Sequence, residues 1–329
     1  MAQFSTKIKK LGVYTSGGDA PGMNAAVRAV VRAAHGYNLE IMGIYQGYVG
    51  MLEDNIKTLT PRDMANIIQR GGTVIKTGRC LEFQKPEFRK KAYDNLVKHQ
   101  IDALVCIGGD GSFRGALALW NDHKIPIAGV PGTIDNDIFG TDLTIGFDTA
   151  VNTSVDAIDK IRDTADSHDR LFIVEVMGRN SGFIATAVGL AGGAEEIFTP
   201  DGNTTVDKAV ERIREAQKKG KRSSIIITSE GQKPGRAYDL AESIRKKSGL
   251  DAKVCILGHQ QRGGAPSAND RILASRMGAA AVDALMSGVC NVMIGIDGKN
   301  LVQVPLETAT GTEKKNNPEL INLSYRLAR

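Results

Sequence analysis

The chain has 329 residues, of which 42% are hydrophobic and 24% charged, and its formal net charge is +5. This composition excludes disorder and is typical of a folded globular protein, while the length favours two domains. No hydrophobic run approaches the roughly 18 residues that a membrane span needs, and no Lys/Arg tract favours nucleic-acid binding. We therefore expect neither a membrane nor a nucleic acid as partner, and the mild positive charge fits a small anionic ligand.

The four cysteines, Cys80, Cys106, Cys255 and Cys290, are widely spaced and form no CxxC pair. We expect reduced thiols in a cytoplasmic protein. Cys106 and Cys255 stand inside apolar runs, so we expect both to be buried.

One pattern recurs along the chain: a short apolar run, a glycine-containing loop and a segment with helical spacing. The apolar runs are 11–15, 102–107, 126–130, 171–176, 224–228 and 253–257, and the helical segments are 25–34, 112–120, 149–161, 181–193 and 271–288. Continuous apolar runs indicate strands covered on both faces, and their alternation with helices indicates a doubly wound α/β fold with mostly parallel sheets. Residues 292–306 predict a hairpin around Asp297-Gly298, and a polar linker at 310–317 precedes a final short helix.

Two glycine loops enter helices directly after predicted strands, SGGDAPGMN at 16–24 and GGDGS at 108–112. The backbone N–H groups of such loops, together with the helix dipole, form a cradle for an anion. Neither loop is a Walker A sequence or a GxGxxG motif, and the chain lacks the HRD loop of protein kinases. Asp110 leaves two interpretations open: a turn residue, or a carboxylate that holds Mg²⁺ between itself and bound phosphates.

A second carboxylate-bearing loop, PGTIDND at 131–137, follows the next strand and contributes Asp135 and Asp137. Transfer of a phosphoryl group to an alcohol needs a carboxylate that accepts the proton of the hydroxyl group. The two loops together therefore suit phosphoryl transfer from a nucleotide.

Cations must surround the group that is transferred, and Arg79 and Arg179 are candidates because they stand in short glycine-flanked loops. His259 and Arg262 in GHQQRGG are candidates for binding a phosphate on the alcohol. Lone arginines are mostly solvated surface charges, so each signal is weak by itself. Together they predict phosphoryl transfer from a nucleotide to a phosphorylated alcohol.

Eight motifs occur in an order that resembles bacterial ATP-dependent 6-phosphofructokinases, from Lys10 to about Gly288: TSGGDAPGMNAAVR, RGGT, GGDGS, PGTIDND, TIGFDTA, EVMGR, LGHQQRGG and DRILASRMG. The resemblance implies two three-layer α/β/α domains, one for ATP at 1–145 plus about 260–310 and one for the sugar phosphate at 146–259 plus 311–329. It also implies transfer of the γ-phosphoryl group of Mg-ATP to the 1-hydroxyl of fructose 6-phosphate. The implied assembly is a cytoplasmic homotetramer in which a neighbouring subunit completes each active site.

The resemblance further implies roles for individual residues. Asp135 matches the proton acceptor, Arg179 and Arg79 match the cations, and Thr133 and Asp137 are their neighbours. The positions that bind ATP are Gly18, Tyr48, Arg79, Cys80, Gly109, Asp110, Gly111 and Ser112, and Asp110 also organises Mg²⁺. The positions that bind the sugar phosphate are Thr133, Ile134, Asp135, Met177, Gly178, Arg179, Glu230, His259, Gln260, Gln261 and Arg262, with Arg170 and Lys253 supplied by the neighbouring subunit.

A regulatory site for ADP or phosphoenolpyruvate is implied at Arg28, Arg32, Arg162, Gly193, Glu195, Lys219, Lys221, Arg222 and Ser223. The residue types alone, several cations with one carboxylate, suit a diphosphate and a metal. Without the resemblance, a solvated face of two helices is the preferred interpretation.

Three positions depart from the family pattern. Pro61 stands where an effector-contacting Arg is usual, although Arg62 is adjacent, and this weakens the expectation of regulation. Lys253 stands where an Arg is expected, and its alternative interpretation is an exposed first residue of a strand. Lys76-Thr77 replaces the more usual Gly-Ser before Arg79.

Alternative functions differ from the prediction at identifiable residues. Pyrophosphate-dependent phosphofructokinases resemble the chain but carry a second Asp after GGD and a Lys before TIDND, where Gly111 and Gly132 stand here. Glycine at 111 leaves room for the α-phosphate of a nucleotide. Other GGDG kinases, which act on nicotinamide dinucleotide or lipids, lack TIDND and GHxQRGG. A non-catalytic effector-binding subunit is expected to lack the base or the cations, yet Asp135, Arg79 and Arg179 are present.

Overall fold

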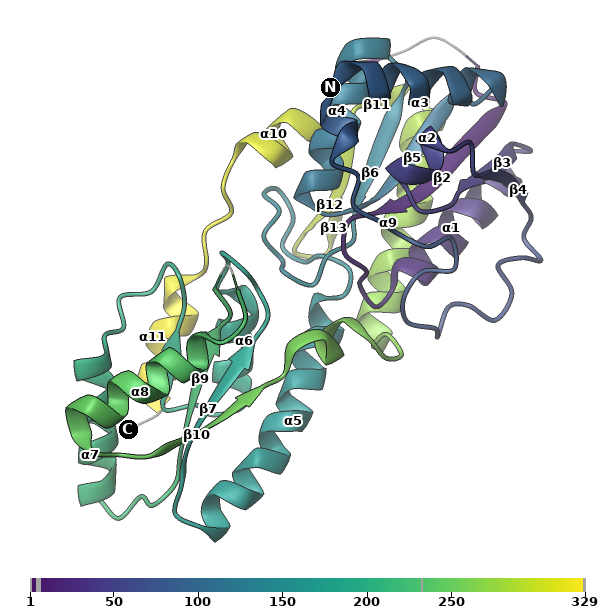
Figure 1. Cartoon of the computed structure of the whole chain (residues 1–329). Helices are drawn as coiled ribbons and strands as arrows, with labels where there is room; N and C mark the ends of the chain where they lie inside the picture. Colours follow the sequence, from purple (N-terminus) through teal and green to yellow (C-terminus); the bar gives the residue numbers. More distant parts are fainter. Residues whose placement is uncertain (1, 4–6, 232, 328–329) are drawn as a thin grey trace. The chain divides into compact units, whose positions relative to one another are not determined.

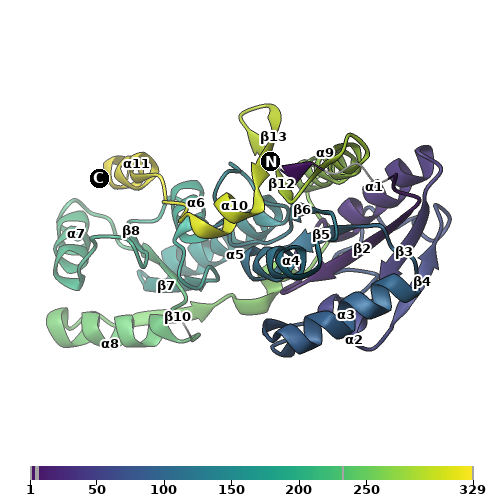
Figure 2. The same ribbon diagram turned by 90° about the horizontal axis from the view of Figure 1, so that it is seen from above.

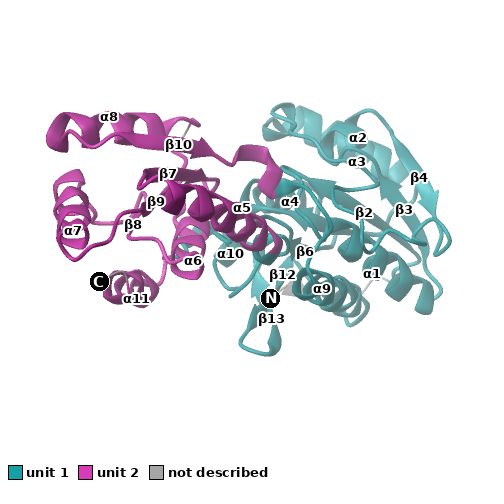
Figure 3. Cartoon of the chain, turned by 90° about the horizontal axis from the view of Figure 1, so that it is seen from below, with its two compact units in different colours: residues 1–148, 262–314 teal, residues 149–261, 315–329 magenta. Residues whose placement is uncertain are grey.

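The computed structural model describes residues 2–3, 7–231 and 233–327, which form two compact units (Figure 3). Unit 1 comprises Met1–Asp148 and Arg262–Lys314, and unit 2 comprises Thr149–Gln261 and Lys315–Arg329. The domain boundaries predicted from the sequence, at 145/146, 259/260 and about 310/311, and the assignment of one domain to ATP and the other to the sugar phosphate stay predictions. None of the described helices combines the length and the hydrophobicity that a membrane-spanning helix needs.

Unit 1 is built on a seven-stranded sheet in the order β13-β12-β6-β5-β2-β3-β4. Its five inner strands run parallel, and the two edge strands pair antiparallel with their neighbours. A short antiparallel pair of β1 and β11 stands apart from this sheet. The strands are β1 (Ala2–Gln3), β2 (Lys10–Ser16), β3 (Glu40–Ile44), β4 (Ile56–Leu59), β5 (Ala103–Gly108), β6 (Ile127–Pro131), β11 (Val289–Cys290), β12 (Val292–Asp297) and β13 (Asn300–Pro305).

Helices cover both faces of the seven-stranded sheet (Figures 1 and 2). Helices α1 and α9 pack against each other on one face, and α2, α3, α4 and α10 lie on the other. The bounds are α1 (Met23–Gly36), α2 (Tyr48–Leu52), η1 (Glu82–Gln84), α3 (Pro86–Lys98), α4 (Asp110–His123), α9 (Ala268–Met286) and α10 (Leu306–Gly311).

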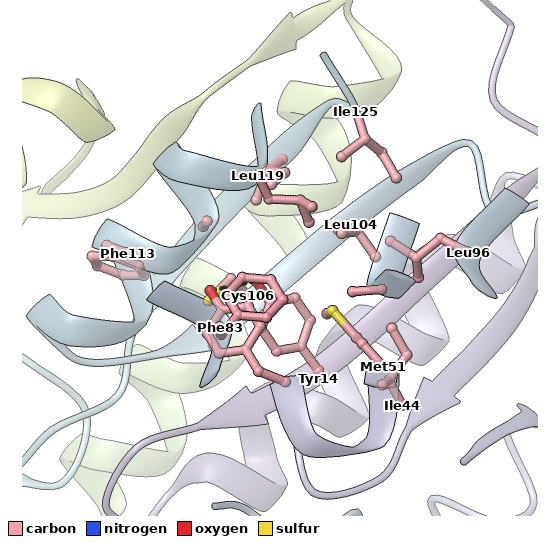
Figure 4. Close-up of a cluster of buried hydrophobic side chains, with 14 of the residues drawn as sticks. Tyr14, Ile44, Met51, Phe83, Leu96, Leu104, Cys106, Phe113, Leu119 and Ile125 are labelled. Carbon is pink, nitrogen blue, oxygen red and sulfur yellow. Dashed lines mark hydrogen bonds between the residues drawn. The ribbon is translucent and has the colours of Figure 1, made fainter. Parts of the chain in front are cut away.

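A hydrophobic core fills the space between the sheet and α3 and α4 (Figure 4). Leu104 and Cys106 of β5 point to the same face because side chains alternate along a strand, and they meet Leu96 of α3 and Leu119 of α4. All four side chains are fully buried. Burial of a large aliphatic side chain contributes roughly 1.5–3 kcal/mol, so this face holds α4, and with it the GGDGS loop, firmly on the sheet.

Unit 2 is built on a four-stranded parallel sheet in the order β10-β7-β9-β8. Helices α7 and α8 share a core with one face, and α5 and α6 cover the other (Figure 3). The strands are β7 (Leu171–Val176), β8 (Glu196–Phe198), β9 (Ser224–Ser229) and β10 (Ala252–Ile256). The helices are α5 (Phe147–Ser167), α6 (Phe183–Ala191), α7 (Val206–Lys218), α8 (Arg236–Ser248), η2 (Gly258–Arg262) and α11 (Pro318–Leu327).

The structure confirms the doubly wound α/β fold, the six predicted strands and the hairpin of β12 and β13. Two expectations are wrong. Strand β10 is an edge strand whose Val254 and Cys255 stay partly exposed, so it is not covered on both faces and Cys255 is not buried. The strands β3, β4 and β8 have no counterpart in the prediction. All four cysteines are free thiols.

Candidate active site

The two carboxylate-bearing loops lie side by side at one edge of the sheet in unit 1. They follow the neighbouring parallel strands β5 and β6, whose register pairs Gly108 with Pro131. The Gly132 N–H donates to the Gly108 carbonyl at 3.0 Å. A Cβ placed on Gly109 would lie 3.5 Å from Cβ of Thr133. The GGDGS and PGTIDND loops therefore share the carboxyl-end edge of the sheet, where open α/β sheets bind ligands.

The GGDGS loop forms the N-terminus of α4. Gly109 is the N-cap residue and has no side chain with which to cap the helix. The Ser112 N–H donates to the Gly109 carbonyl at 3.0 Å, so the N–H groups of Asp110 and Gly111 are the ones placed at the helix N-terminus to favour an anion. A Cβ on Gly111 would meet nothing within 4 Å, whereas one on Gly108 would lie 2.6 Å from the Ser112 hydroxyl and from the Ser16 carbonyl. The loop is thus tightly packed on its inner side and open above Gly111, as a phosphate cradle requires.

A second pair of loops lies beside this cradle in unit 1. The Thr77 hydroxyl donates to the Gly17 carbonyl at 3.0 Å, and the Gly17 N–H donates to the Gly78 carbonyl at 3.3 Å. Lys76 adopts the left-handed conformation with φ 56°, which a glycine reaches without strain. The Lys76-Thr77 departure from the family pattern therefore costs some backbone freedom but retains a hydroxyl that ties the loops together. Arg79, two residues further on, is exposed.

Two further predicted residues of this region are fixed by protein contacts. The Cys80 thiol is partly buried, which raises its pKa, and its Sγ lies 3.6 Å from Glu82. An Nη atom of Arg262 donates to the Asp19 carbonyl at 3.0 Å, and its guanidinium fills the space beside Gly18. Arg262, predicted to bind the sugar phosphate, therefore lies against the glycine loop of unit 1.

Tyr48, predicted to contact ATP, lies beneath the cradle. Only 4% of the residue is exposed, and its hydroxyl donates to the Ser112 carbonyl at 2.5 Å and lies 3.1 Å from the Tyr14 hydroxyl. Burial raises the pKa of Tyr48 well above its usual range. Its ring stacks on Phe83 with centroids 3.9 Å apart. The inward-turned hydroxyl therefore supports the first turn of α4, and the predicted contact of Tyr48 with ATP stays a prediction.

The PGTIDND loop holds its first carboxylate in a largely buried place. Asp135 is 9% exposed, and its N–H donates to the Thr133 hydroxyl at 3.2 Å. The Thr144 hydroxyl donates to the Thr133 carbonyl at 2.6 Å, and the fully buried Ile134 anchors the loop in the core. A buried carboxylate on a braced loop is suited to act as a general base.

Asp137 keeps contact with solvent, yet burial by the surrounding protein and then the negative charge of Asp135 raise its pKa to about 6. The charge of Asp110 acts in the same direction. The three carboxylates are therefore close enough to repel one another, and this is the electrostatic setting in which a divalent cation is favourable.

Within the described residues, no group of three or more His, Cys, Asp or Glu side chains has the geometry to hold a metal ion by itself. Mg²⁺ is commonly bound by one or two carboxylates and completed by phosphate oxygens and water, so Asp110 at the mouth of the cradle fits such a site. An ion pair with Arg114 orients Asp110, with the Arg114 Nε atom 2.8 Å from its carboxylate oxygen.

In unit 2, most predicted sugar-phosphate residues follow the carboxyl ends of β7, β9 and β10. Met177 and Glu230 are buried, whereas Arg179, His259 and Gln260 are exposed. Gly178, with φ 132°, makes the turn between Met177 and Arg179 possible, and its carbonyl accepts the Ser181 N–H at 2.7 Å.

Gln261 differs from its neighbours because its side chain is fully buried. Its Oε1 accepts the Met177 N–H and the Ser154 hydroxyl, each at 3.2 Å, and its Nε2 donates to the Gly258 carbonyl at 3.0 Å. These contacts within the protein hold the Met177 turn, and the predicted contact of Gln261 with the substrate stays a prediction.

Arg170 and Lys253 stand at the opposite end of the same sheet. Arg170 directly precedes β7, and Lys253 pairs with Phe172 near the start of that strand. A six-residue strand is roughly 20 Å long, so unit 2 does not bring these cations together with His259 or Arg179. The Lys253 ammonium lies 2.7 Å from Asp251, and this hydrogen bond lowers the pKa of Asp251.

The predicted effector residues are divided between the units. Arg28 and Arg32 lie on α1 in unit 1, and the others lie in unit 2. In unit 2, Arg162 donates to the carbonyls of Gly192 and Gly193, Lys221 pairs with Glu195, Ser223 donates to Asp166, and Arg222 lies 3.7 Å from Asp169. Lys221, Ser223 and Arg222 thus already contact carboxylates of unit 2.

A cavity of about 760 Å³ adjoins this cluster, and Glu195, Lys219 and Lys221 line it together with α7 and α11. Tyr325 of α11 is a lining residue that the sequence did not single out, and the guanidinium of Arg212 lies 4.2 Å from the centre of its ring. No signal in the sequence connects the last helix with this site, because the contact joins residues more than 100 positions apart.

Comparisons with known proteins show which family the chain is similar to. Residues 10–285 match the phosphofructokinase family. ATP-dependent 6-phosphofructokinase 1 of Thermus thermophilus is 54% identical over 321 residues, which cover 98% of this chain and 100% of that protein. ATP-dependent 6-phosphofructokinase 2 of Bacteroides thetaiotaomicron is 51% identical over 322 residues, which cover 98% of this chain and 99% of that protein.

Among solved structures, phosphofructokinase from Saccharomyces cerevisiae is similar with a TM-score of 0.86 and 36% identity, covering 97% of this chain and 48% of the yeast chain. A pyrophosphate-dependent phosphofructokinase from Marinobacter aquaeolei has a TM-score of 0.82 at 23% identity, covering 95% of this chain and 86% of that one, and shows the shared fold alone. The family match, the high identity over nearly the whole length and the fold together establish that this chain belongs to the phosphofructokinase family.

Proposed function

We propose that this chain transfers the γ-phosphoryl group of Mg-ATP to the 1-hydroxyl of D-fructose 6-phosphate, giving fructose 1,6-bisphosphate and ADP, the committed step of glycolysis. The observation that carries the proposal is the juxtaposition of an open anion cradle at Gly109–Ser112 with the buried carboxylate of Asp135 in the loop after the next parallel strand. The two bacterial relatives that are 54% and 51% identical, both named ATP-dependent 6-phosphofructokinases, support it.

In this proposal Asp135 accepts the proton of the 1-hydroxyl, and the cradle residues hold the phosphates of ATP. Thr133 keeps the Asp135 loop in place through its hydroxyl. Mg²⁺, when bound beside Asp110, supplies positive charge that offsets the charge of the phosphates. Arg79 and Arg179 contribute further positive charge to the group that is transferred.

Two glycines favour ATP over pyrophosphate as the donor. The space above Gly111 is open, so a nucleotide phosphate fits there. A Cβ on Gly132 would lie 3.2 Å from Met23 and from Ile107, so the Lys expected at this position in pyrophosphate-dependent relatives is poorly accommodated. Both features depend on local packing and support a nucleotide as phosphoryl donor.

We also propose a cytoplasmic homotetramer whose active sites are shared between subunits. Arg170 and Lys253 stand at the opposite end of the unit 2 sheet from Met177 and His259. One sugar phosphate can contact both groups only if a second copy supplies one of them. The cluster around Arg162 and Glu195 is the proposed site for ADP or phosphoenolpyruvate, with effects weakened by Pro61, which offers no side-chain donor.

The test is formation of fructose 1,6-bisphosphate from fructose 6-phosphate, with ATP or pyrophosphate as donor, with and without Mg²⁺, and with and without ADP. We expect product with ATP and Mg²⁺, little with pyrophosphate, and loss of activity on chelation of Mg²⁺. Faster turnover with pyrophosphate, or no product with either donor, contradicts the proposal. The mass of the protein in solution, measured by light scattering, tests the tetramer separately.

A further inference from the structure

The segment 310–314, marked by the sequence only as the start of a polar linker, contacts the PGTIDND loop directly and the GGDGS loop through Arg114 of α4. The Lys314 ammonium donates to the Asn136 side-chain oxygen at 3.0 Å and to the Asp142 carbonyl at 3.1 Å. The Thr310 carbonyl accepts a hydrogen bond at 2.7 Å from Arg114, whose Nε atom holds Asp110. We propose that Lys314 is a positioning residue of the active site, which holds the PGTIDND loop through Asn136. This inference rests on the proposed function.

Asn136 is the residue whose orientation sets the loop. It stands between Asp135 and Asp137, is 5% exposed, and adopts the left-handed conformation with φ 51°, which asparagine reaches more readily than most residues other than glycine. A lysine can only donate, so its partner is the Asn136 Oδ1 atom. The Nδ2 atom then donates to the Asp142 carbonyl at 3.1 Å. Both ends of the amide are thus occupied, and the backbone that carries the flanking Asp135 and Asp137 is held with it.

Neighbouring contacts place Lys314 accurately enough for this role. Glu313 forms an antiparallel bridge with Ile138, so the residue before Lys314 is held against the backbone two residues after Asn136. Lys314 itself is partly buried, and this burial lowers its pKa to about 8, while the negative charges of Asp142 and Asp137 favour its charged form. It therefore opposes the repulsion between Asp135 and Asp137 while it holds the residue that separates them.

The chain offers a matched control at the next position, because Lys315 is exposed and belongs to unit 2. We compare Lys314→Met with Lys315→Met, which remove the same charge one residue apart, in steady-state kinetics with ATP and fructose 6-phosphate. Misplaced catalytic groups lower turnover steeply, so we expect kcat of Lys314→Met to fall roughly 10- to 100-fold with little change in either KM. Lys315→Met should keep the wild-type kcat.

A double-mutant cycle with Asn136→Ala separates positioning from a general loss of stability. If Lys314 acts through Asn136, the double variant loses no more turnover than the more impaired single variant. Independent, multiplied losses overturn the inference. Lys314→Gln keeps a hydrogen-bond donor and a similar length without the charge, and it is the second variant if Lys314→Met does not fold. Where both fold, Lys314→Gln should retain more turnover than Lys314→Met. Where only Lys314→Gln folds, its kcat should be lower than that of Lys315→Met.

The outcomes for the inference and for the proposed function are distinguishable. An active wild type whose Lys314 variants match Lys315→Met contradicts the positioning role alone. A wild type without activity on ATP and fructose 6-phosphate contradicts the proposed function, and with it the catalytic loop that Lys314 would position.

Discussion

Replacement of Asp137 by Asn tests the electrostatics of the carboxylate-bearing loops most sharply. Burial and the charge of Asp135 raise the pKa of Asp137 from 3.8 to about 6. Between these two pH values the folded chain binds this proton more tightly than the unfolded chain does. Stability therefore falls as the pH rises through this window and stays lower above about 6. Asn carries no charge, so Asp137→Asn should stabilise the protein at pH 8. Below pH 3.8, where Asp137 is protonated in both the folded and the unfolded chain, it should give no such gain.

The magnitude follows from the same two values. The difference between 3.8 and about 6 corresponds to about 3 kcal/mol at 1.36 kcal/mol per pH unit, which is an upper limit. The side chain keeps contact with solvent, which screens its charge, so we expect a gain of about 1 kcal/mol at pH 8. An increase of this size in the free energy of unfolding is measurable by urea denaturation.

Trp120, the single tryptophan, lies on α4 in unit 1 and provides a fluorescence signal from the unit that contains Asp137. We expect the urea midpoint of Asp137→Asn to exceed that of the wild type at pH 8 and to converge with it at about pH 3.5. Asp297→Asn, at the exposed end of β12, is the control and should show no such pH-dependent gain. A variant that is no more stable than the wild type at pH 8 refutes the reasoning.

Three further predictions concern single residues of the site. Gly111→Asp should fold like the wild type because the space around Gly111 is open. It should raise KM for ATP more than KM for fructose 6-phosphate in steady-state kinetics. An unchanged KM for ATP would show that Gly111 does not line the nucleotide site. Tyr48→Phe removes the hydrogen bonds of the Tyr48 hydroxyl to the Ser112 carbonyl and the Tyr14 hydroxyl and should destabilise the chain by roughly 0.5–1.5 kcal/mol in thermal unfolding; an unaltered transition would show that the hydroxyl is not needed. Lys253→Ala should raise KM for fructose 6-phosphate more than it lowers kcat, since a phosphate contact is made in both ground and transition states; a constant KM would leave Lys253 with only its ion pair to Asp251.

The proximity of the two carboxylate-bearing loops was predictable from the sequence. Each loop follows a continuous apolar run, and consecutive runs of this kind form neighbouring parallel strands whose carboxyl ends meet at one edge. The hydrogen bond between Gly132 and Gly108 is the direct consequence. The anion cradle at Gly109–Ser112 was predictable for the same reason, because glycines that enter a helix leave its first N–H groups accessible.

Other features were beyond the reach of sequence patterns. A run such as KVCIL shows hydrophobicity but not the number of neighbouring strands, so the edge position of β10 and the partial exposure of Cys255 were not predictable. Tyr48 and Gln261 match family positions, but only their burial and their hydrogen bonds show that they support the loops. The contact of Lys314 with Asn136 joins residues 178 positions apart, and no local pattern indicates it.

The central claim is that Asp135 is the general base of an ATP-dependent phosphoryl transfer to fructose 6-phosphate. The most direct measurement is kcat of Asp135→Asn with ATP and fructose 6-phosphate at saturation, together with both KM values. Asn keeps the shape of the side chain and cannot accept the proton as a carboxylate does. We predict that kcat falls roughly 10²- to 10⁴-fold while both KM values stay near those of the wild type. A kcat within a few-fold of the wild type would contradict the assignment.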